Sequence, residues 1–185
     1  MMTRRMQASP DLPSVLLAAA ERADHIWQLP SQQLVDATES KLTEIRKAEQ
    51  SAIQVLSRII DEHGWPGVRL VGIEGARAAW LLALRADRFP RAQERFLHRL
   101  KEAARRGDAE WSWWAHLYDR VCVQRGTPQS YGTQHILTGN RLVPHPVADA
   151  EELDARRKTV GLPPYERATS GLKTRARRAR AVGTC

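Results

Sequence analysis

Side chains that could do chemistry gather around one turn in the last third of the chain. The pair Asp119-Arg120 lies near the end of a helical pattern, and the run Gln-Ser-Tyr-Gly-Thr-Gln follows at 129–134, after a glycine and a proline. An aspartate can orient or deprotonate a substrate group, and an arginine can hold a carboxylate or phosphate through two parallel hydrogen bonds. Tyr131 adds a phenol that can donate a hydrogen bond or a proton. The pattern therefore indicates a site for a polar substrate at this turn.

Three residues are candidates for catalytic proton transfer. We expect Asp119 and Tyr131 to be the proton-handling groups, and Asp87 is the best remaining carboxylate. Each of the three also has a structural interpretation. Asp119 can pair with an arginine, Tyr131 can satisfy backbone groups around a loop, and Asp87 can cap the helix that starts near Pro90.

Eight further residues are expected to bind the substrate. The arginines among them would hold an anion, the glutamines would orient the substrate through their amides, and a tryptophan at a rigid corner adds a large aromatic surface. If the run at 129–134 is a strand, Gln129, Tyr131 and Thr133 share one face of it. The alternative for the two neighbouring arginines is a solvated helix end, where positive charge is favourable. The eight residues are Trp65, Arg85, Gln93, Arg120, Gln129, Gln134, Arg156 and Arg157.

Motifs for metal ions and for bound cofactors are absent from the sequence. There is no HExxH or CxxC spacing, and neither GxxxxGK[ST] nor GxGxxG occurs. His116 and Asp119 are three residues apart, but a lone pair of this kind is more often incidental. Cys122 lies between two valines and is typical of a core residue rather than a nucleophile. We therefore expect no metal and no cofactor.

These patterns favour a small enzyme that uses acid–base chemistry on a polar or anionic small molecule or peptide, without a metal ion. The alternative is a non-catalytic ligand-binding or regulatory module whose site has degenerated. A third hypothesis is a nucleic-acid-associated protein that acts through Lys173 to Arg180 and binds less tightly as salt rises.

Charge is concentrated at the C-terminal end of the chain. Residues 166–185 hold six Lys or Arg residues and one Glu, so they carry +5 of the formal net charge of +8. We expect this tail to be flexible and to bind polyanions weakly and without specificity. The apolar run at 15–20 is too short to span a membrane and lacks a cleavage region, so no membrane partner is expected. With only Cys122 and Cys185 present, we expect a cytoplasmic protein without structural disulfides.

Hydrophobic periodicity predicts a mainly α protein with one small β-hairpin near the C-terminal end. We expect residues 1–11 to be disordered and residues 12–165 to form a single helical domain. The hairpin is expected at about 131–147, with a tight turn at Gly139-Asn140 and an edge strand limited by prolines. The six expected helices cover approximately 13–28, 36–63, 73–86, 90–106, 108–126 and 149–160.

Several helix ends carry recognisable signals. Asp36 and Glu39 have the spacing of a capping box, and Gly64 suits the left-handed position after the same helix. Pro90 suits the first turn of its helix, and Asp108 is expected to cap the helix that follows it. Residues 68–71 are expected to be an extended connector, because four residues are too few to show a helical period.

The polar motifs resemble those of a bacterial family of uncharacterised proteins, a domain of unknown function marked by GWP, DR and YGTQ motifs. The resemblance covers residues 49–165 and extends to Asp24 in the first helix. It implies no activity, cofactor or partner. It rests on His63-Gly64-Trp65-Pro66, Val71-Gly72, Ala79-Trp80-Leu81-Leu82, Ala86-Asp87, Gln93, Asp119-Arg120-Val121, Gly126, Gln129, Tyr131-Gly132-Thr133-Gln134, Asp154, Arg156-Arg157 and Gly161-Leu162.

One position departs from the pattern of that family. The family usually has Gln-His before the Ala-Asp pair, and this chain has Leu84-Arg85 there. A histidine at this position could act as an acid, a base or a ligand, whereas an arginine can bind an anion. The departure is consistent with a site whose chemistry differs from that of its relatives.

Overall fold

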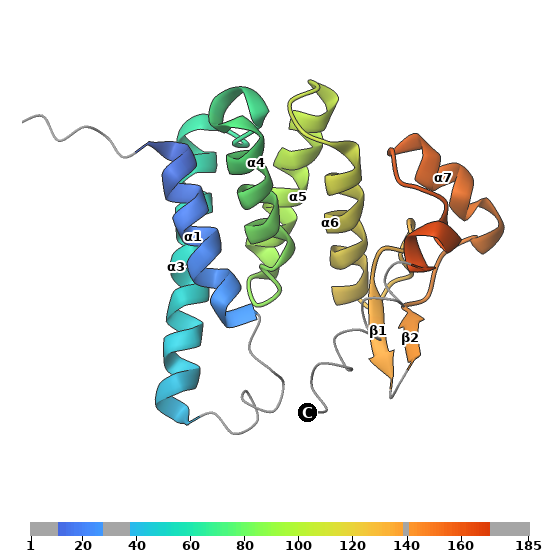
Figure 1. Cartoon of the computed structure of the whole chain (residues 1–185), viewed down its shortest axis with the longest axis horizontal. Coiled ribbons are helices and arrows are strands. Elements are labelled where there is room, and N and C mark those ends of the chain that lie inside the picture. Colours follow the sequence, from blue (N-terminus) through green and yellow to red (C-terminus); the bar gives the residue numbers. More distant parts are fainter. Residues whose placement is uncertain (1–10, 28–37, 139–140, 171–185) are drawn as a thin grey trace, which may run out of the picture. The chain divides into compact units, whose positions relative to one another are not determined.

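The computed structural model describes residues 11–27, 38–138 and 141–170. The chain divides into two compact units, Met1–Ala109 and Glu110–Cys185, here called unit 1 and unit 2. The described residues include six α-helices, a further helical segment at residues 165–170, one short 3-10 helix and one antiparallel hairpin (Figure 1). The predicted fold class, mainly α with a small hairpin near the C-terminal end, is therefore confirmed.

Unit 1 is a bundle of four described helices. Figure 1 shows α1 alongside α3 and α4, and α5 packs against α3 and α4. Aliphatic side chains from every helix close its core, among them Leu16, Leu56, Leu82 and Leu100, each at 0% exposure. The helices are α1 (Leu12–Trp27), α3 (Glu39–His63), α4 (Val68–Leu84) and α5 (Pro90–Arg105).

Small residues let α1 and α4 approach each other closely. A methyl group placed on Gly75 would lie 3.5 Å from the Cα atom of Pro13, so the start of α1 lies against α4 at this position. The two helices run in the same direction (Figure 1). α4 buries a row of small side chains and contacts α1, α3 and α5, as expected of a helix rich in alanine.

The expected extended connector at 68–71 is wrong, because these residues form the first turn of α4. A break follows at Gly72, whose φ of 70° and ψ of 173° interrupt the helix. The turn is held by Asp108, which accepts the backbone N–H of Val68 with its own carbonyl at 3.0 Å and the N–H of Arg69 with its carboxylate at 2.8 Å. Asp108 thus caps α4 and not the following helix, for which Glu110 is the N-cap residue.

Other helix ends agree more closely with the sequence signals. Gly64 follows α3 with the expected positive φ of 77°, although its ψ of −163° lies outside the left-handed helical region. Pro90 occupies the first turn of α5, as expected. At the start of α3 the N-cap residue is Thr38, whose hydroxyl accepts the backbone N–H of Lys41 at 3.3 Å. Asp36, the expected capping residue, lies outside the described residues.

Unit 2 combines α6 with the hairpin and a short C-terminal helix. The strands pair in the register Ile136 to Val143, and the expected turn at 139–140 lies outside the described residues. Asp149 and Glu152 have the spacing of a capping box in the sequence, but Asp149 has a φ of 40° and makes no side-chain cap. The elements are α6 (Trp111–Gln124), β1 (His135–Thr138), β2 (Arg141–Pro144), η1 (Ala150–Glu152) and α7 (Leu153–Thr159).

Residues 129–134, read from the sequence as a strand, form a loop. Gln129 makes an isolated parallel bridge with Val147, and regular strand pairing begins only at His135. Because the loop is not a strand, the alternation of Gln129, Tyr131 and Thr133 does not place them on one face.

The C-terminal tail is described only in part. Residues 165–170 are helical, whereas residues 171–185, including the basic segment from Lys173 to Arg180, lie outside the described residues. In the described parts of both units, no helix has the length and apolar character needed to cross a membrane.

Candidate functional site

The carboxylate of Asp119 is the centre of the loop at 129–134. Asp119 lies on α6 with 0% exposure. Its Oδ1 accepts the backbone N–H of Ser130 at 2.8 Å and that of Tyr131 at 3.1 Å. Its Oδ2 accepts both the backbone N–H and the hydroxyl of Thr133, at 3.0 and 2.9 Å. One buried carboxylate therefore satisfies the amide groups on this side of the loop.

Two arginines of α7 bind the carbonyl groups of the same loop. Arg156 donates from Nε to the carbonyl of Ser130 at 2.9 Å, and also donates to the carbonyls of Ala148 and Asp149. Arg157, which is 3% exposed, donates to the carbonyl of Tyr131. The backbone N–H groups of Ser130, Tyr131 and Thr133 thus go to a carboxylate, and the carbonyls of Ser130 and Tyr131 go to guanidinium groups.

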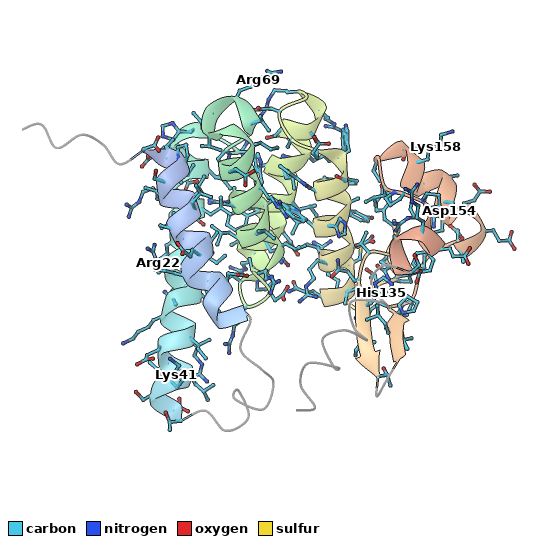
Figure 2. The ribbon with its side chains drawn as sticks, in the orientation of Figure 1. Arg22, Lys41, Arg69, His135, Asp154 and Lys158 are labelled. Atoms are coloured by element: carbon cyan, nitrogen blue, oxygen red, sulfur yellow. The ribbon has the colours of Figure 1, made fainter. Side chains whose placement is uncertain are left out.

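Further contacts of Arg157 tie α7 to the residues that follow it. The guanidinium donates to the carbonyl of Pro163 at 2.7 Å and lies over the ring of Tyr165, 5.7 Å from the ring centroid. Burial lowers the pKa of Arg157 below its usual value. Asp154 on the same helix (labelled in Figure 2) accepts the backbone N–H of Tyr165 at 2.7 Å.

Gln129 closes the loop on itself. Its side chain is fully buried and donates to the carbonyls of Gln134 and His145, at 3.0 and 2.9 Å. Its amide oxygen accepts the backbone N–H of Gln134 at 2.9 Å. All three bonds link backbone groups across the loop, so the amide acts here as a brace.

Gln134 and Arg120 connect the loop to α6. Arg120 donates to the Gln134 side-chain oxygen at 3.3 Å. The nitrogen of the same amide donates to the carbonyl of His116 at 3.3 Å and to the hydroxyl of Thr133 at 3.0 Å. Seven of the predicted site residues, all in unit 2, are therefore gathered around one loop, and most of their bonds go to the backbone.

Tyr131 is the exception in this group, because its side chain points into an aromatic cluster. Its ring lies edge-on to Trp114 and Tyr118, at centroid distances of 6.0 and 6.1 Å. Burial, helped by the nearby Asp119 carboxylate, raises the pKa of Tyr131 above its usual value of 10.0. The phenol therefore keeps its proton at neutral pH.

The remaining predicted residues belong to unit 1, where Gln93 and Asp87 lie at the end of α4. Gln93 is fully buried and donates to the carbonyls of Ala83 and Leu84, at 3.1 and 3.2 Å, and to the Asp87 carboxylate at 3.4 Å. Trp65 is 3% exposed. Within the described residues, the indole nitrogen of Trp65 and the amide oxygen of Gln93 have no hydrogen-bond partner.

Arg85 lines a groove of about 370 Å³ between α1 and α4. Its apolar lining residues are Leu17, Ala20, Ala78 and Leu81, of which Ala78 is buried and Leu17 is 43% exposed. Its rim carries three carboxylates and two guanidinium groups, which belong to Glu21, Asp24, Glu74, Arg77 and Arg85. The groove thus joins Arg85 to Asp24, two positions that the family resemblance marks in different parts of the sequence.

Among the charged residues of the groove, sequence reasoning predicted only Arg85 as a site residue. Asp24 was named only through the family resemblance, and Glu21, Glu74 and Arg77 were missed. The available signal was the spacing along each helix. The lining residues recur at steps of three and four on both α1 and α4. That spacing shows that the residues lie on one face of their own helix. It does not show which other helix this face packs against.

The described residues contain no group of three or more His, Cys, Asp and Glu side chains placed to hold a metal ion. They define a small, mainly α-helical protein with a braced loop in one unit and a charged groove in the other. The chain belongs to the family of unknown function DUF6624, whose profile matches residues 10–175. No curated protein and no solved structure matches the chain.

Proposed function

We propose that this protein is a ligand-binding module that holds a small polar molecule in the groove between α1 and α4. The observation that carries the proposal is the meeting of Asp24 and Arg85 on the rim of one cavity of about 370 Å³. This volume lies at the small end of the range of about 300–1,000 Å³ that is common for ligand sites.

The register of the two helices supports the meeting of Asp24 and Arg85. Gly75 lies against Pro13, and the helices run in the same direction (Figure 1). With a rise of about 1.5 Å per residue, Asp24 lies about 16 Å beyond Pro13 and Arg85 about 15 Å beyond Gly75. The carboxylate and the guanidinium therefore belong to the same end of the groove, close to the C-terminal ends of both helices.

The contacts in unit 2 support binding over catalysis. A general base must reach a substrate proton, directly or through one water molecule. Asp119 is 0% exposed and its two oxygens are occupied by loop donors. Gln129, Arg156 and Arg157 are likewise engaged with backbone carbonyls. The hydrogen bonds of these residues give them a structural role, which is to fix the conformation of the loop.

An acid–base enzyme is a second candidate function, and Tyr131 is the observation in its favour. Its phenol is half-buried and its pKa is raised, mainly by burial. A protonated phenol in an aromatic surrounding is suited to donate a proton or a hydrogen bond to a substrate. Proton transfer by Asp119 and Asp87 stays a prediction.

A thermal-melting screen tests the proposal. The library contains amino acids, short peptides, carboxylates, phosphates and amines. The native protein is compared with Asp24→Asn, Arg85→Gln and Tyr131→Phe, and Arg91→Gln on the exposed face of α5 is the control. We expect a compound that raises the melting temperature of the native and control proteins but not of the two groove variants. Stabilisation that disappears only in Tyr131→Phe would support the second candidate and overturn the first.

A further inference from the structure

We propose that the ligand of this groove is a free α-amino acid with an apolar side chain. The inference rests on the proposed function and adds the chemical class of the ligand. An α-amino acid carries an ammonium and a carboxylate on the same carbon, so it needs opposite charges close together at one end of its site. The groove provides this arrangement at the end where Asp24 and Arg85 lie.

The carboxylate of the ligand would pair with Arg85. A guanidinium binds a carboxylate through two parallel N–H···O bonds, which fixes the orientation as well as the position of the ligand. Arg85 is exposed and is the residue that follows α4, so its side chain is accessible to a ligand entering from solvent.

The ammonium of the ligand would pair with Asp24. Glu21 precedes Asp24 by one helical turn and also lines the groove, so a second carboxylate lies nearby. α4 ends at Leu84, so its C-terminal end adds partial negative charge at this end of the groove. These three contributions favour a cationic group beside Asp24.

Neither a simple anion nor a simple cation matches the whole rim. The rim has three carboxylates and two guanidinium groups, and a ligand of one sign would pair with one set while facing like charges on the other. Asp24 and Arg85 each already take part in a contact within the protein. A zwitterion can replace or extend such contacts with both partners at once, whereas a singly charged ligand can do so with one.

The apolar lining of the groove suits an aliphatic side chain. Leu17 and Leu81 supply apolar surface, and Ala20 and Ala78 are small enough to leave space above them. Contact of an aliphatic side chain with this apolar surface removes part of it from water, which favours leucine or methionine over glycine. The apolar lining thus adds a preference for an aliphatic side chain to the pairing of the ligand carboxylate and ammonium with Arg85 and Asp24.

Three probes and four proteins test this inference by titration calorimetry. The probes are L-leucine, N-acetyl-L-leucine, which lacks the ammonium, and L-leucinamide, which lacks the carboxylate. The proteins are the native chain, Arg85→Gln, Asp24→Asn and the control Arg91→Gln. We expect leucine to bind the native and control proteins at least about tenfold more tightly than either blocked probe, because each loses one charge-assisted pair.

The variants assign each charged group to its partner. Arg85→Gln is expected to abolish the preference for leucine over leucinamide, and Asp24→Asn the preference for leucine over N-acetyl-leucine. Equal binding of leucine and either blocked probe to the native protein would overturn the inference, and so would no binding of leucine. If the library screen then yields a ligand of another charge type that depends on Asp24 and Arg85, the proposed function stands and only the amino-acid assignment falls.

Discussion

Thr133 places both its backbone N–H and its hydroxyl on the same carboxylate oxygen of Asp119, at 3.0 and 2.9 Å. The two residues are 14 positions apart, so the contact joins α6 to the far side of the loop. A neutral side chain at 119 cannot accept all of these donors. The Asp119 carboxylate therefore holds the loop against α6.

Replacing Asp119 by asparagine is expected to destabilise unit 2 strongly. The asparagine side chain keeps one acceptor oxygen. In place of the second carboxylate oxygen it has an NH₂ group, which cannot accept the donors that this oxygen satisfies in the native protein. We expect the free energy of unfolding to fall by roughly 2–4 kcal/mol, the cost of leaving buried donors unpaired. Chemical denaturation measures the change, and faster amide exchange at Ser130, Tyr131 and Thr133 assigns it to the loop.

Asp154→Asn is the matched control for that change. Asp154 is exposed and accepts a single backbone N–H, from Tyr165 at 2.7 Å. We expect a loss of about 1 kcal/mol or less, as for one exposed hydrogen bond. Equal losses in the two variants would contradict the role assigned to Asp119.

The contribution of the Thr133 hydroxyl to stability can be tested separately from that of the Thr133 methyl group. Thr133→Val removes the bond to Asp119 and the acceptor that the Gln134 amide uses at 3.0 Å, whereas Thr133→Ser keeps both. We expect valine to cost about 1–2 kcal/mol and serine clearly less. Urea titration of both variants decides the point, and a serine variant as unstable as valine would show that the methyl group matters instead.

Gly67 is expected to be required for its lack of a side chain. Its φ of −80° and ψ of −179° are accessible to alanine, so any cost is steric. A Cβ atom at Gly67 would lie 2.3 Å from Oδ2 and 2.5 Å from the carbonyl oxygen of Asp108. Relieving the clash would disturb the cap of α4, and we expect a loss of about 1–3 kcal/mol.

Thermal melting measures the effect of Gly67→Ala, with Val68→Ala as the control. Val68 is the next residue and is 39% exposed, so its truncation removes little buried surface. A melting temperature for Gly67→Ala equal to that of the control would show that Asp108 can move aside without cost.

Unit 2 is expected to lose stability in mild acid because of His116. Burial lowers the pKa of His116 below its ordinary value of 6.5, against an opposing effect of Asp119. The folded state therefore binds this proton less readily than the unfolded state. As pH falls through about 6.5 toward the folded-state pKa, the unfolded state gains protons first and the free energy of unfolding decreases.

Chemical denaturation of the full chain at pH 7.5 and pH 5.5 gives the free energy of unfolding at each pH and so measures this dependence. We expect His116→Gln to reduce the difference between the two values, and His98→Gln, an exposed position in α5, is the control. An unchanged difference in His116→Gln would assign the acid sensitivity to other groups, such as His135, whose pKa burial also lowers.

Local signals were enough to predict most of the helices. The periodicity of α3 and the end signals at Gly64 and Pro90 depend on residues close in sequence, and the structure agrees with them. The turn at 68–71 was missed because its cap, Asp108, is 39 residues away from Arg69. A four-residue helical turn held by a distant residue leaves no local pattern.

The role of the predicted residues as a site stays a prediction, and their geometry could not be predicted from the sequence. The motif residues of unit 2 do gather around one loop, but alternation of polar residues suggested a strand where the backbone donors go to Asp119. To predict the groove in unit 1, one must know which faces of α1 and α4 meet. Contacts such as Pro13 against Gly75 fix this. No spacing within one helix contains that information.

Mapping of the bound ligand by two-dimensional amide NMR tests the central claim most directly. The library compound that stabilises the native protein most is titrated into labelled native and Arg85→Gln proteins. If the groove is the binding site, chemical shifts change along residues 17–24 of α1 and 74–85 of α4, and the changes are lost in Arg85→Gln. Shift changes confined to residues 129–134, or unaffected by Arg85→Gln, would contradict a ligand site in the groove.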